Sequence, residues 1–361
     1  MLRGDGAWHE AIASIASLCA RPLLLGRSAS TRSLRASCQR ELEQVGLACH
    51  WAELNHDCCE VDLQRIEAEV KTGGADGVSH ANGVVAIGGG KVLDAGKLLA
   101  HRLGVPCITV PTSAATCAGW TALANVYSPQ GAFIGDMALA RCPDLLVFDH
   151  SFVRQAPERT LASGIADAMA KWYEASVSSG TSNDGLIQQA VQMARVLRDQ
   201  LLLEAQTALA DPGGEAWVRV VEACALTAGL IGGIGGARCR TVAAHAVHNG
   251  LTQLEATHGV LHGEKVGFGI LVQLRLEEVL GGSQLAGQAR RQLIPLFRQL
   301  QLPVELADLG LGNANLSDLQ RACDFACQEG SDLHHLPFAV SASDLLAALV
   351  STCSSRERLT A

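Results

Sequence analysis

Four of the chain's twelve histidines lie in the segment 241–264, which reads TVAAHAVHNGLTQLEATHGVLHGE. His245 and His248 are three residues apart, so they would share one face of a helix. His262 follows after a predicted loop and directly precedes a glycine. Imidazole nitrogens bind zinc and ferrous iron, and they also transfer protons near neutral pH. The segment therefore fits a metal site, a proton relay, or histidines that only pack in the core.

An aspartate elsewhere in the chain favours the metal site. The segment 162–175, ASGIADAMAKWYEA, places Asp167 on the apolar side of a predicted helix. An isolated buried carboxylate is costly, so Asp167 needs a partner. Lys171, one helical turn further on, is one candidate, and a divalent cation is the other. Histidine and aspartate together supply the nitrogen and oxygen donors of a zinc or ferrous-iron site.

A glycine-rich turn predicts a phosphate-binding site. The segment 86–97, AIGGGKVLDAGK, follows a buried apolar run and opens a predicted helix. Free backbone amides and the positive end of a helix dipole bind phosphates. The turn is neither a Walker loop, because Val92 follows the lysine, nor G-x-G-x-x-G, because Leu93 replaces the last glycine. Three glycines followed by Lys91 favour a pyrophosphate site over an ordinary strand–helix turn.

A hydroxyl-rich segment follows the next predicted strand. It spans 110–128, VPTSAATCAGWTALANVYS, with hydroxyls at Thr112, Ser113, Thr116 and Thr121. The carboxyl end of a parallel strand is where α/β proteins bind their ligands. The alternative is a polar loop whose side chains satisfy its own backbone amides.

The first 150 residues alternate short apolar runs with helical patterns. Strands are predicted within 21–30, 83–90, 105–114 and 144–149, and helices within 30–49, 62–76 and 91–104. This alternation predicts a Rossmann-like parallel sheet, and the helical periodicity after Asp149 predicts an all-α remainder. We expect a dinucleotide-binding α/β domain over 1–152 and a helical metal-binding and catalytic domain over 153–361.

Composition narrows the class of protein. The net charge of −8 argues against a nucleic-acid partner, because phosphate binding needs a basic surplus. No apolar run is expected to reach a membrane span, and Asp5, His9 and Glu10 interrupt any signal-peptide core. The odd number of cysteines, thirteen, suggests reduced thiols and a cytoplasmic location. The close cysteine pairs are expected to be small core residues.

Taken together, four segments resemble one family, the metal-dependent polyol and iron-containing alcohol dehydrogenases. These segments are GGGKVLDAGK, PTSAAT, GIADAMAKWYEA, and AAHAVHNGL followed by LHGEKVGFG, in the family's order and spacing. The resemblance implies a dehydroquinate synthase-like architecture with a metal in the cleft between the two domains. The family's ligands fall on Asp167, His245 and His262. Iron enzymes of the family often add a histidine where this chain has Lys171, so the resemblance favours zinc over iron.

The resemblance also implies a nicotinamide cofactor site. We expect the following residues to contact the cofactor: Gly89, Gly90, Lys91, Asp94, Thr112, Thr116, Thr121, Leu123 and Tyr127. The first three would lie at the diphosphate. His248 would either support a metal ligand or relay a proton, Lys171 is a second catalytic candidate, and His258 is a bystander.

The predicted substrate pocket departs from that of glycerol dehydrogenases, which carry an aspartate where this chain has Cys117. With Trp120 nearby, Cys117 predicts an uncharged pocket. The segments TCAGWTAL, AKWYEA and LHHLP resemble the hydroxycarboxylate dehydrogenase branch, which reduces 2-oxo acids. An anionic substrate suits a pocket without a carboxylate, because like charges repel strongly in a dry site. Lys171 offers a positive partner, and His334 is a further expected substrate contact.

The choice of cofactor is predicted from the first strand. Arg27 and Ser28 follow it, near where NAD-selective relatives place an acid for the ribose hydroxyls. Arginine and serine suit a 2′-phosphate, so we favour NADPH over NADH. The alternative is that Arg27 is a solvated surface residue.

We therefore predict a metal-dependent, NAD(P)-linked enzyme that interconverts a small 2-oxo acid and its 2-hydroxy acid. The metal would stabilise alkoxide character while hydride passes to or from the nicotinamide C4. Glycerol dehydrogenase is the nearest alternative. A cyclase of the dehydroquinate synthase type would need more basic residues for a phosphate-bearing substrate, and a non-catalytic metal- or nucleotide-binding protein would show no turnover. We expect a homo-oligomer whose partner is a small molecule.

Overall fold

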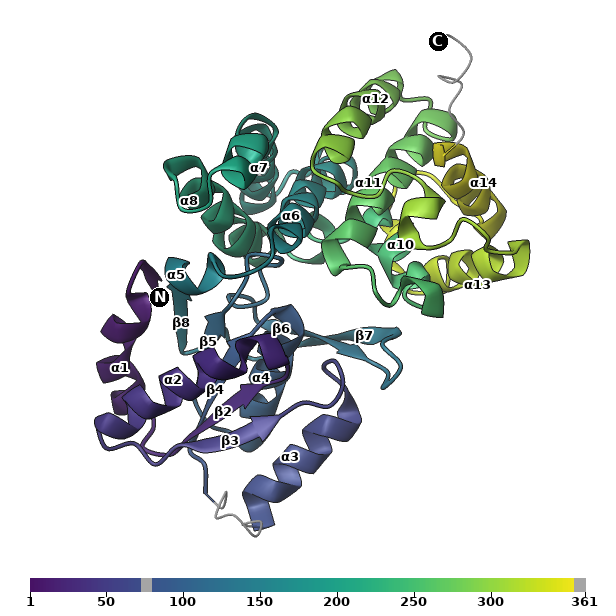
Figure 1. Ribbon diagram of the computed structural model, residues 1–361. Coiled ribbons are helices and arrows are strands. Elements are labelled where there is room, and N and C mark those ends of the chain that lie inside the picture. The colour runs from purple at the N-terminus through teal and green to yellow at the C-terminus, as the bar shows by residue number, and fades with distance from the viewer. Residues whose placement is uncertain (73–79, 354–361) are drawn as a thin grey trace. The chain divides into compact units, whose positions relative to one another are not determined.

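The computed structural model describes residues 1–72 and 80–353, which form two compact units (Figure 1). The N-terminal unit is Met1–Pro157 and the C-terminal unit is Glu158–Ala361. The boundary expected at 152/153 falls in a short helix, α5 (His150–Val153). The assignment of dinucleotide binding to the N-terminal unit and of metal binding to the C-terminal unit remains a prediction.

The N-terminal unit is built on a parallel sheet, as predicted. Among the described residues its order is β1-β8-β5-β4-β2-β3, and every neighbouring pair is parallel. The strands are β1 (Leu2–Gly4), β2 (Pro22–Gly26), β3 (His50–Glu53), β4 (Gly83–Gly88), β5 (Cys107–Pro111) and β8 (Leu145–Asp149). The sequence patterns predicted β2, β4, β5 and β8, whereas β1 and β3 lack a long enough apolar run.

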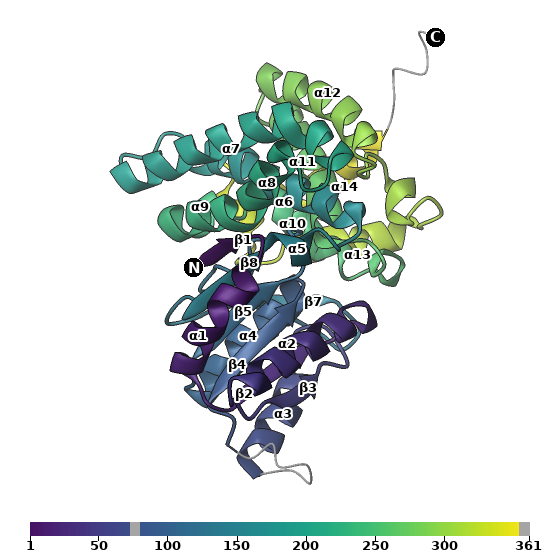
Figure 2. The same ribbon diagram turned by 60° about the vertical axis from the view of Figure 1, so that its left-hand side comes forward.

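Helices cover both faces of this sheet, which is why its strands read as continuous apolar runs. In β2, Leu23 and Leu25 pack into one core with α3 (Glu60–Thr72) and α4 (Gly90–Leu103). Leu24 packs into the other core. There it meets helices α1 (Ala7–Leu18) and α2 (Arg32–Gln44), which lie in front of the strands in Figure 2. The glycine stop predicted for α3, Gly73 and Gly74, lies outside the described residues.

The order of connections creates a switch point between β4 and β2. From β2 the chain passes through α2 to β3, and from β4 it passes through α4 to β5 on the opposite side. Because these helices lie on opposite faces, the connections from the two strands diverge at their carboxyl ends. Open α/β sheets bind their ligands in this position.

A two-stranded hairpin was not expected. Strand β6 (Leu123–Tyr127) pairs antiparallel with β7 (Phe133–Ala138), so the end of the hydroxyl-rich segment is strand rather than loop. The residues of β7 alternate only weakly between buried and exposed, which explains the missing periodic signal.

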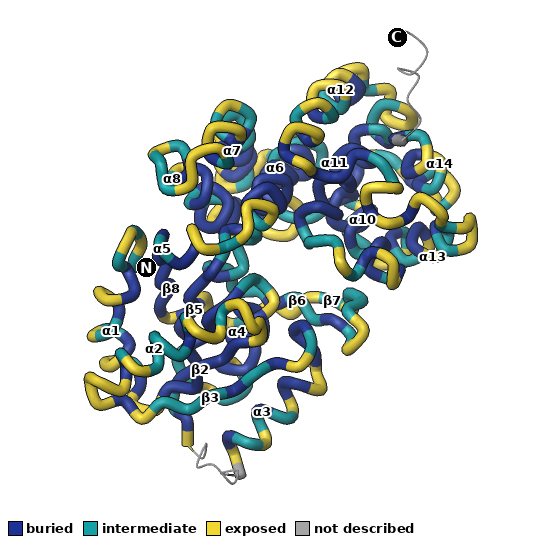
Figure 3. Tube along the Cα trace, viewed as in Figure 1, coloured by how far each residue is buried: buried dark blue, intermediate teal, exposed yellow. Residues whose placement is uncertain are grey.

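The C-terminal unit is helical throughout its described elements, as predicted. Its helices are α6 (Glu158–Ser179), α7 (Gly185–Ala210), α8 (Glu215–Glu222), α9 (Ala228–Gly235), α10 (Ala243–Leu251), α11 (His262–Val279), α12 (Gln284–Gln299), α13 (Leu316–Ala326) and α14 (Ala342–Cys353). Figure 3 shows α6 largely buried and α12 with a wide exposed face. Gly263 lets α11 pack directly on α6, because a Cβ there would lie 1.8 Å from the Ser163 carbonyl oxygen.

One expectation from composition is wrong. The continuous helical stretch Glu215–Gly235 is long and apolar enough to cross a membrane, and an 18-residue window within it has a mean hydropathy of 1.5. The stretch consists of α8, a π-helical turn (Ala223–Thr227) and α9, and 56% of that window is buried. It packs on α7, as a core helix does. No disulfide joins the twelve cysteines whose side chains are described.

Candidate functional site

Three helices of the C-terminal unit bring the predicted metal ligands together. Asp167 lies on α6, His245 on α10, and His262 is the first residue of α11. One donor atom from each lies within 4.8 Å of the others. The Oδ1 atom of Asp167 is 3.3 Å from His245 Nε2 and 3.5 Å from His262 Nε2. The fold thus brings Asp167 and His262, which lie almost a hundred positions apart in the sequence, together with His245 at one site.

The geometry of this group fits a metal ion. Asp167 Oδ1 is buried and has no hydrogen-bond partner among the described residues. Donors at about 2.0–2.1 Å from a tetrahedral metal lie roughly 3.3–3.4 Å from one another, and the two oxygen-to-nitrogen distances are close to that value. The unsatisfied oxygen and the two facing nitrogens form a donor set suited to zinc or ferrous iron.

The pKa shifts of Asp167 and His262, two of the three residues, suit metal binding. Burial opposes a charge on Asp167, but the Lys171 ammonium and the two histidines hold the pKa of this carboxyl well below its usual value. Burial lowers the pKa of His262. Burial and the neighbouring His262 also hold the pKa of His248 well below its usual value. An ionised carboxylate and a neutral imidazole are the forms that donate electron pairs to a metal.

Glu174 orients one of the histidines and was not identified from the sequence. Its carboxylate is fully buried and accepts hydrogen bonds from His245 Nδ1 at 2.6 Å and from the backbone nitrogen of Val242 at 2.7 Å. It also accepts one from the His245 backbone nitrogen at 3.0 Å. With Nδ1 held in this way, Nε2 faces Asp167. Burial opposes protonation of His245, but the Glu174 charge raises its pKa. The seven-residue spacing from Asp167, two turns on one helix face, was the available signal.

His248 supports the other histidine. His262 Nδ1 lies 2.9 Å from His248 Nε2, and His248 Nδ1 lies 2.9 Å from the Asn249 side-chain oxygen. If His262 Nε2 keeps its lone pair for a metal, its Nδ1–H donates to His248, which in turn donates to Asn249. His258 stands apart, with its Nε2 3.0 Å from the Thr252 carbonyl oxygen.

Lys171 is almost completely buried beside the metal-ligating group. Its Nζ lies 3.8 Å from Asp167 Oδ1 and donates to the Arg240 carbonyl oxygen at 3.4 Å. The sequence offered Lys171 or a divalent cation as the partner of Asp167, and the structure places both Lys171 and the two histidines that could hold a cation beside it.

The predicted diphosphate residues lie at the carboxyl ends of β4 and β5 in the N-terminal unit. Gly89 caps α4 and Gly90 is its first residue. A Cβ on Gly90 would lie 2.8 Å from Thr116 Oγ1, so the glycine turn and the hydroxyl-rich segment pack against each other. The backbone nitrogen of Thr112 donates to the Gly88 carbonyl oxygen at 3.0 Å, which fixes the same junction.

Other predicted cofactor residues lie next to a buried ion pair. Asp94 pairs with Lys97 at 2.9 Å and accepts from the Asn125 backbone nitrogen at 3.2 Å. Lys97 also donates to Thr121 Oγ1 at 3.2 Å and to the Leu123 carbonyl oxygen. Asp94 is buried, and these contacts favour a role in holding β6 on α4 over the expected contact with the cofactor. Tyr127, also buried, lies with its ring 5.1 Å from Lys91 Nζ.

The expected substrate residues differ in burial. Cys117 and Trp120 are half-buried in the hydroxyl-rich segment, where the Trp120 backbone nitrogen donates to the Cys117 carbonyl oxygen at 3.1 Å. His334 is exposed, and its Nε2 lies 3.1 Å from the Gln328 carbonyl oxygen. The neighbouring His335 is less exposed and lies 3.3 Å from the Thr241 carbonyl oxygen, just before α10. Of these two histidines, the structure thus connects His335 to the start of α10, the helix that carries His245.

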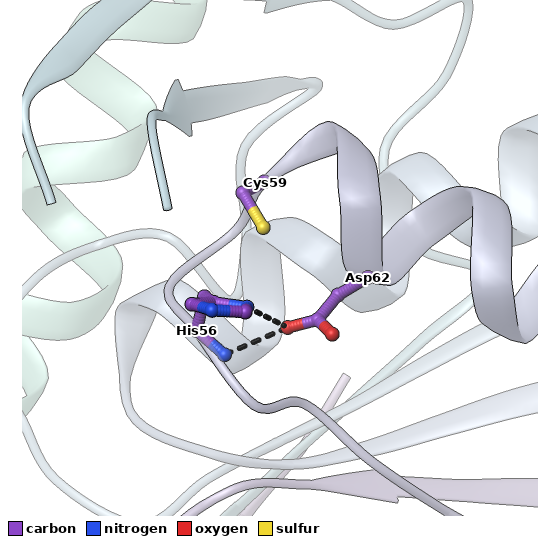
Figure 4. A group of neighbouring side chains, drawn as sticks. All are labelled: His56, Cys59 and Asp62. Atoms are coloured by element: carbon purple, nitrogen blue, oxygen red, sulfur yellow. Dashed lines mark hydrogen bonds and ion pairs between the residues drawn. The ribbon is translucent and has the colours of Figure 1, made fainter. Parts of the chain in front are cut away.

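A second group of metal-ligating side chains consists of His56, Cys59 and Asp62 (Figure 4). Its carboxylate already has partners within the chain. One oxygen accepts from the backbone nitrogens of Asn55 and His56 at 2.8 and 2.7 Å, and the other accepts from Arg65 at 3.2 Å. These bonds favour a role for Asp62 in fixing the loop before α3 over a role as a metal ligand.

Sequence comparison places the chain among dehydrogenases. Residues 1–150 match the family described as iron-containing alcohol dehydrogenase. The uncharacterized oxidoreductase slr1167 of Synechocystis sp. is 52% identical over 93% of this chain and 86% of its own length. Hydroxycarboxylate dehydrogenase A of Escherichia coli K12 is 34% identical over 81% of this chain and 78% of its own length. A glycerol dehydrogenase of Pseudomonas putida is 32% identical over 86% of this chain and 84% of its own length.

Comparison with solved structures supports the same family. A probable glycerol dehydrogenase from Sinorhizobium meliloti 1021 matches with a TM-score of 0.83 and 29% identity, over 97% of this chain and 95% of that one. The fold and the relatives define an NAD-binding, metal-dependent oxidoreductase that acts on CH–OH groups. The chain belongs to the iron-containing alcohol dehydrogenase family, which confirms the resemblance seen in the sequence.

Proposed function

We propose that this dehydrogenase interconverts a small 2-oxo acid and its 2-hydroxy acid. The observation that carries the proposal is Cys117, an uncharged residue where the family resemblance expects the aspartate of glycerol dehydrogenases. The relative named hydroxycarboxylate dehydrogenase A supports the same substrate class. Removing a carboxylate from a dry pocket favours an anionic substrate, because like charges repel strongly there.

We propose Asp167, His245 and His262 as the metal ligands, with zinc favoured over iron. A bound divalent ion would supply a Lewis acid for the substrate oxygen. Lys171 keeps Asp167 ionised and balances its charge. The sequence left His248 as a support for a metal ligand or a proton relay, and both of its ring nitrogens have partners within the chain. Its geometry favours holding the ring of His262, which leaves the proton transfer to a water.

We propose that the cofactor's diphosphate lies at Gly89, Gly90 and Lys91, with Thr112 and Thr116 beside it. The free amides of Gly89 and Gly90 at the start of α4, with the helix dipole behind them, support this placement. Hydride would pass between the substrate carbon and the nicotinamide C4. Arg27, at the end of β2, favours NADPH over NADH.

Glycerol dehydrogenase is the second candidate, because relatives of that name match at nearly the same identity as the hydroxycarboxylate enzyme. The test follows nicotinamide absorbance with zinc-loaded protein. 2-Oxobutanoate and 2-oxoglutarate are compared with dihydroxyacetone, each with NADPH and NADH. Faster turnover of the oxo acids is expected. A preference for dihydroxyacetone would restore the polyol function. No turnover, with metal and cofactor bound, would favour a non-catalytic protein or another substrate.

We also propose a cytoplasmic homo-oligomer that acts on a small molecule, without nucleic-acid or membrane partners. The absence of disulfides among the described cysteines suits a reducing compartment. Light scattering of the purified protein measures the oligomeric state, and a monomer would contradict this part of the proposal.

A further inference from the structure

The Asp57 carboxylate pairs with two cations, one from each side of the switch point between β2 and β4. Asp57 lies in the loop between β3 and α3, and its two oxygens accept from Arg27 Nη1 and from Lys91 Nζ. Arg27 follows β2, and Lys91 follows the glycine turn after β4. The Asp57 side chain is 8% exposed, whereas those of Arg27 and Lys91 are 40% and 44% exposed. The acid is buried and its two cations reach it from solvent.

The loop that carries Asp57 is held on both sides. The backbone nitrogen of Leu54 donates to the Gly26 carbonyl oxygen at 2.9 Å, and that of Tyr127 donates to the Cys58 carbonyl oxygen at 2.8 Å. Between them, the Asp62 carboxylate accepts from the Asn55 and His56 nitrogens, as Figure 4 shows for His56. The backbone on both sides of Asp57 is therefore fixed, and its short side chain has less room to move than the long, half-exposed Arg27 side chain.

The charge of Asp57 affects which nicotinamide cofactor can bind beside Arg27. In dinucleotide-binding folds the ribose next to the adenine lies at the end of the strand beside the glycine turn, which here is β2. A ribose with two hydroxyls can donate to a carboxylate. A 2′-phosphate carries about −1.5 to −2 charges at neutral pH and is repelled by a fixed carboxylate. It can pair with Arg27 only if Arg27 leaves Asp57.

We infer that Asp57 determines the cofactor specificity of this enzyme, by holding Arg27 and by repelling the 2′-phosphate of NADPH. Arg27 then raises the affinity for NADPH and Asp57 lowers it. The enzyme binds NADPH, but more weakly than it would with Arg27 alone. The inference rests on the proposed cofactor site at Gly89 and Gly90. It adds an acid from a different loop, which the sequence analysis did not consider.

The test measures binding, so that it does not depend on turnover. Calorimetry of the full chain compares adenosine 2′,5′-bisphosphate with adenosine 5′-diphosphate. Asp57→Asn is expected to strengthen bisphosphate binding about tenfold, equivalent to about 1.4 kcal/mol, and to change diphosphate binding less than about twofold. Arg27→Gln is expected to do the reverse and weaken only the bisphosphate. Glu69→Gln, which removes one carboxylate from an ion pair on α3, is the charge-matched control and should change neither.

Three outcomes would overturn the inference. Equal weakening of both ligands in Asp57→Asn would mean that Asp57 only positions Lys91 at the diphosphate. Weakening of the bisphosphate alone would mean that Asp57 presents Arg27 to the phosphate. Unchanged selectivity in Arg27→Gln would remove the opposing partner. Failure of the wild-type protein to bind either ligand would instead overturn the proposed cofactor site, and the inference with it.

Discussion

The Glu174 carboxylate accepts a hydrogen bond from His245 Nδ1 at 2.6 Å, while Nε2 of the same ring lies 3.3 Å from Asp167 Oδ1. Asp167 and Glu174 are two turns apart on α6, so a single helix supplies one proposed ligand and the group that orients another. A carboxylate behind a histidine fixes its tautomer and makes the imidazole a stronger donor.

Glu174→Gln is expected to weaken zinc binding by about 10- to 100-fold. The glutamine has one acceptor oxygen for three N–H groups, and its amide would face the His245 Nδ1–H. Competition with a chromophoric chelator measures the affinity. Glu158→Gln, at the exposed start of the same helix, is the control. A variant that binds zinc as tightly as wild type would contradict the orienting role.

His262→Ala is expected to abolish both metal content and turnover, because it removes one of three proposed donors. Metal analysis of the purified variant and a turnover assay provide the measurement. His258→Ala is the matched control, since His258 lies in the same segment and its ring nitrogen lies 3.0 Å from the Thr252 carbonyl oxygen. An active variant that retains its metal would rule out His262 as a ligand.

His248→Leu distinguishes a positioning group from a proton relay. It leaves the His262 Nδ1–H buried without an acceptor, at a cost of about 1–3 kcal/mol. We expect lower stability to urea and weaker zinc binding together. If His248 is a relay instead, kcat falls and its pH profile shifts while zinc affinity stays at the wild-type value.

Gly90→Ala tests the glycine turn. The new Cβ would lie 2.8 Å from Thr116 Oγ1, so the turn or the hydroxyl-rich segment must shift. Binding of adenosine 5′-diphosphate is expected to weaken about tenfold, or about 1.4 kcal/mol. Gly135→Ala, where an added Cβ meets nothing within 4 Å, should bind like wild type. Unchanged binding in Gly90→Ala would argue against a diphosphate at this turn.

Glu277 on α11 predicts a pH dependence of stability. Burial raises its pKa from 4.5 to about 7, although Gln273 donates to its carboxylate at 3.0 Å. The folded state therefore binds this proton more tightly than the unfolded state. The contribution of Glu277 is fully present below about pH 4.5 and is lost as the pH rises through about 7. Glu277→Gln should raise the Tm at pH 8 and leave it nearly unchanged at pH 4.

The neighbouring Glu278 provides a control of opposite sign. Burial acts against its ionisation, but Arg275 and Arg290 hold its pKa below the ordinary value. Its contribution is present above that ordinary value and is lost as the pH falls through the folded pKa. Glu278→Gln should therefore lower the Tm at pH 8. Equal shifts for the two variants would contradict the assignment of the Glu277 effect to its pKa.

Local patterns in the sequence were enough to predict the class of fold and the glycine turn of the proposed cofactor site. Continuous apolar runs such as that of β4 report burial on two faces, and a 3.6-residue period reports a helix, because both depend on neighbours along the chain. The glycine turn was readable for the same reason, whereas the set Asp167, His245 and His262 was implied by the family resemblance. The hairpin β6–β7 and strand β3 were missed, because short, half-exposed strands have weak periodicity.

Only the tertiary structure decided which groups meet. Asp57 reaches Arg27 and Lys91 because strand order, not sequence distance, sets the loops side by side. Asp94, which the sequence assigned to the cofactor, pairs with Lys97 and also accepts from Asn125 of the unexpected hairpin. His262 arrives beside Asp167 because a glycine lets α11 pack on the α6 backbone. Ion pairs and sets of metal ligands depend on contacts between residues far apart in the sequence, and local sequence patterns do not show which residues make those contacts.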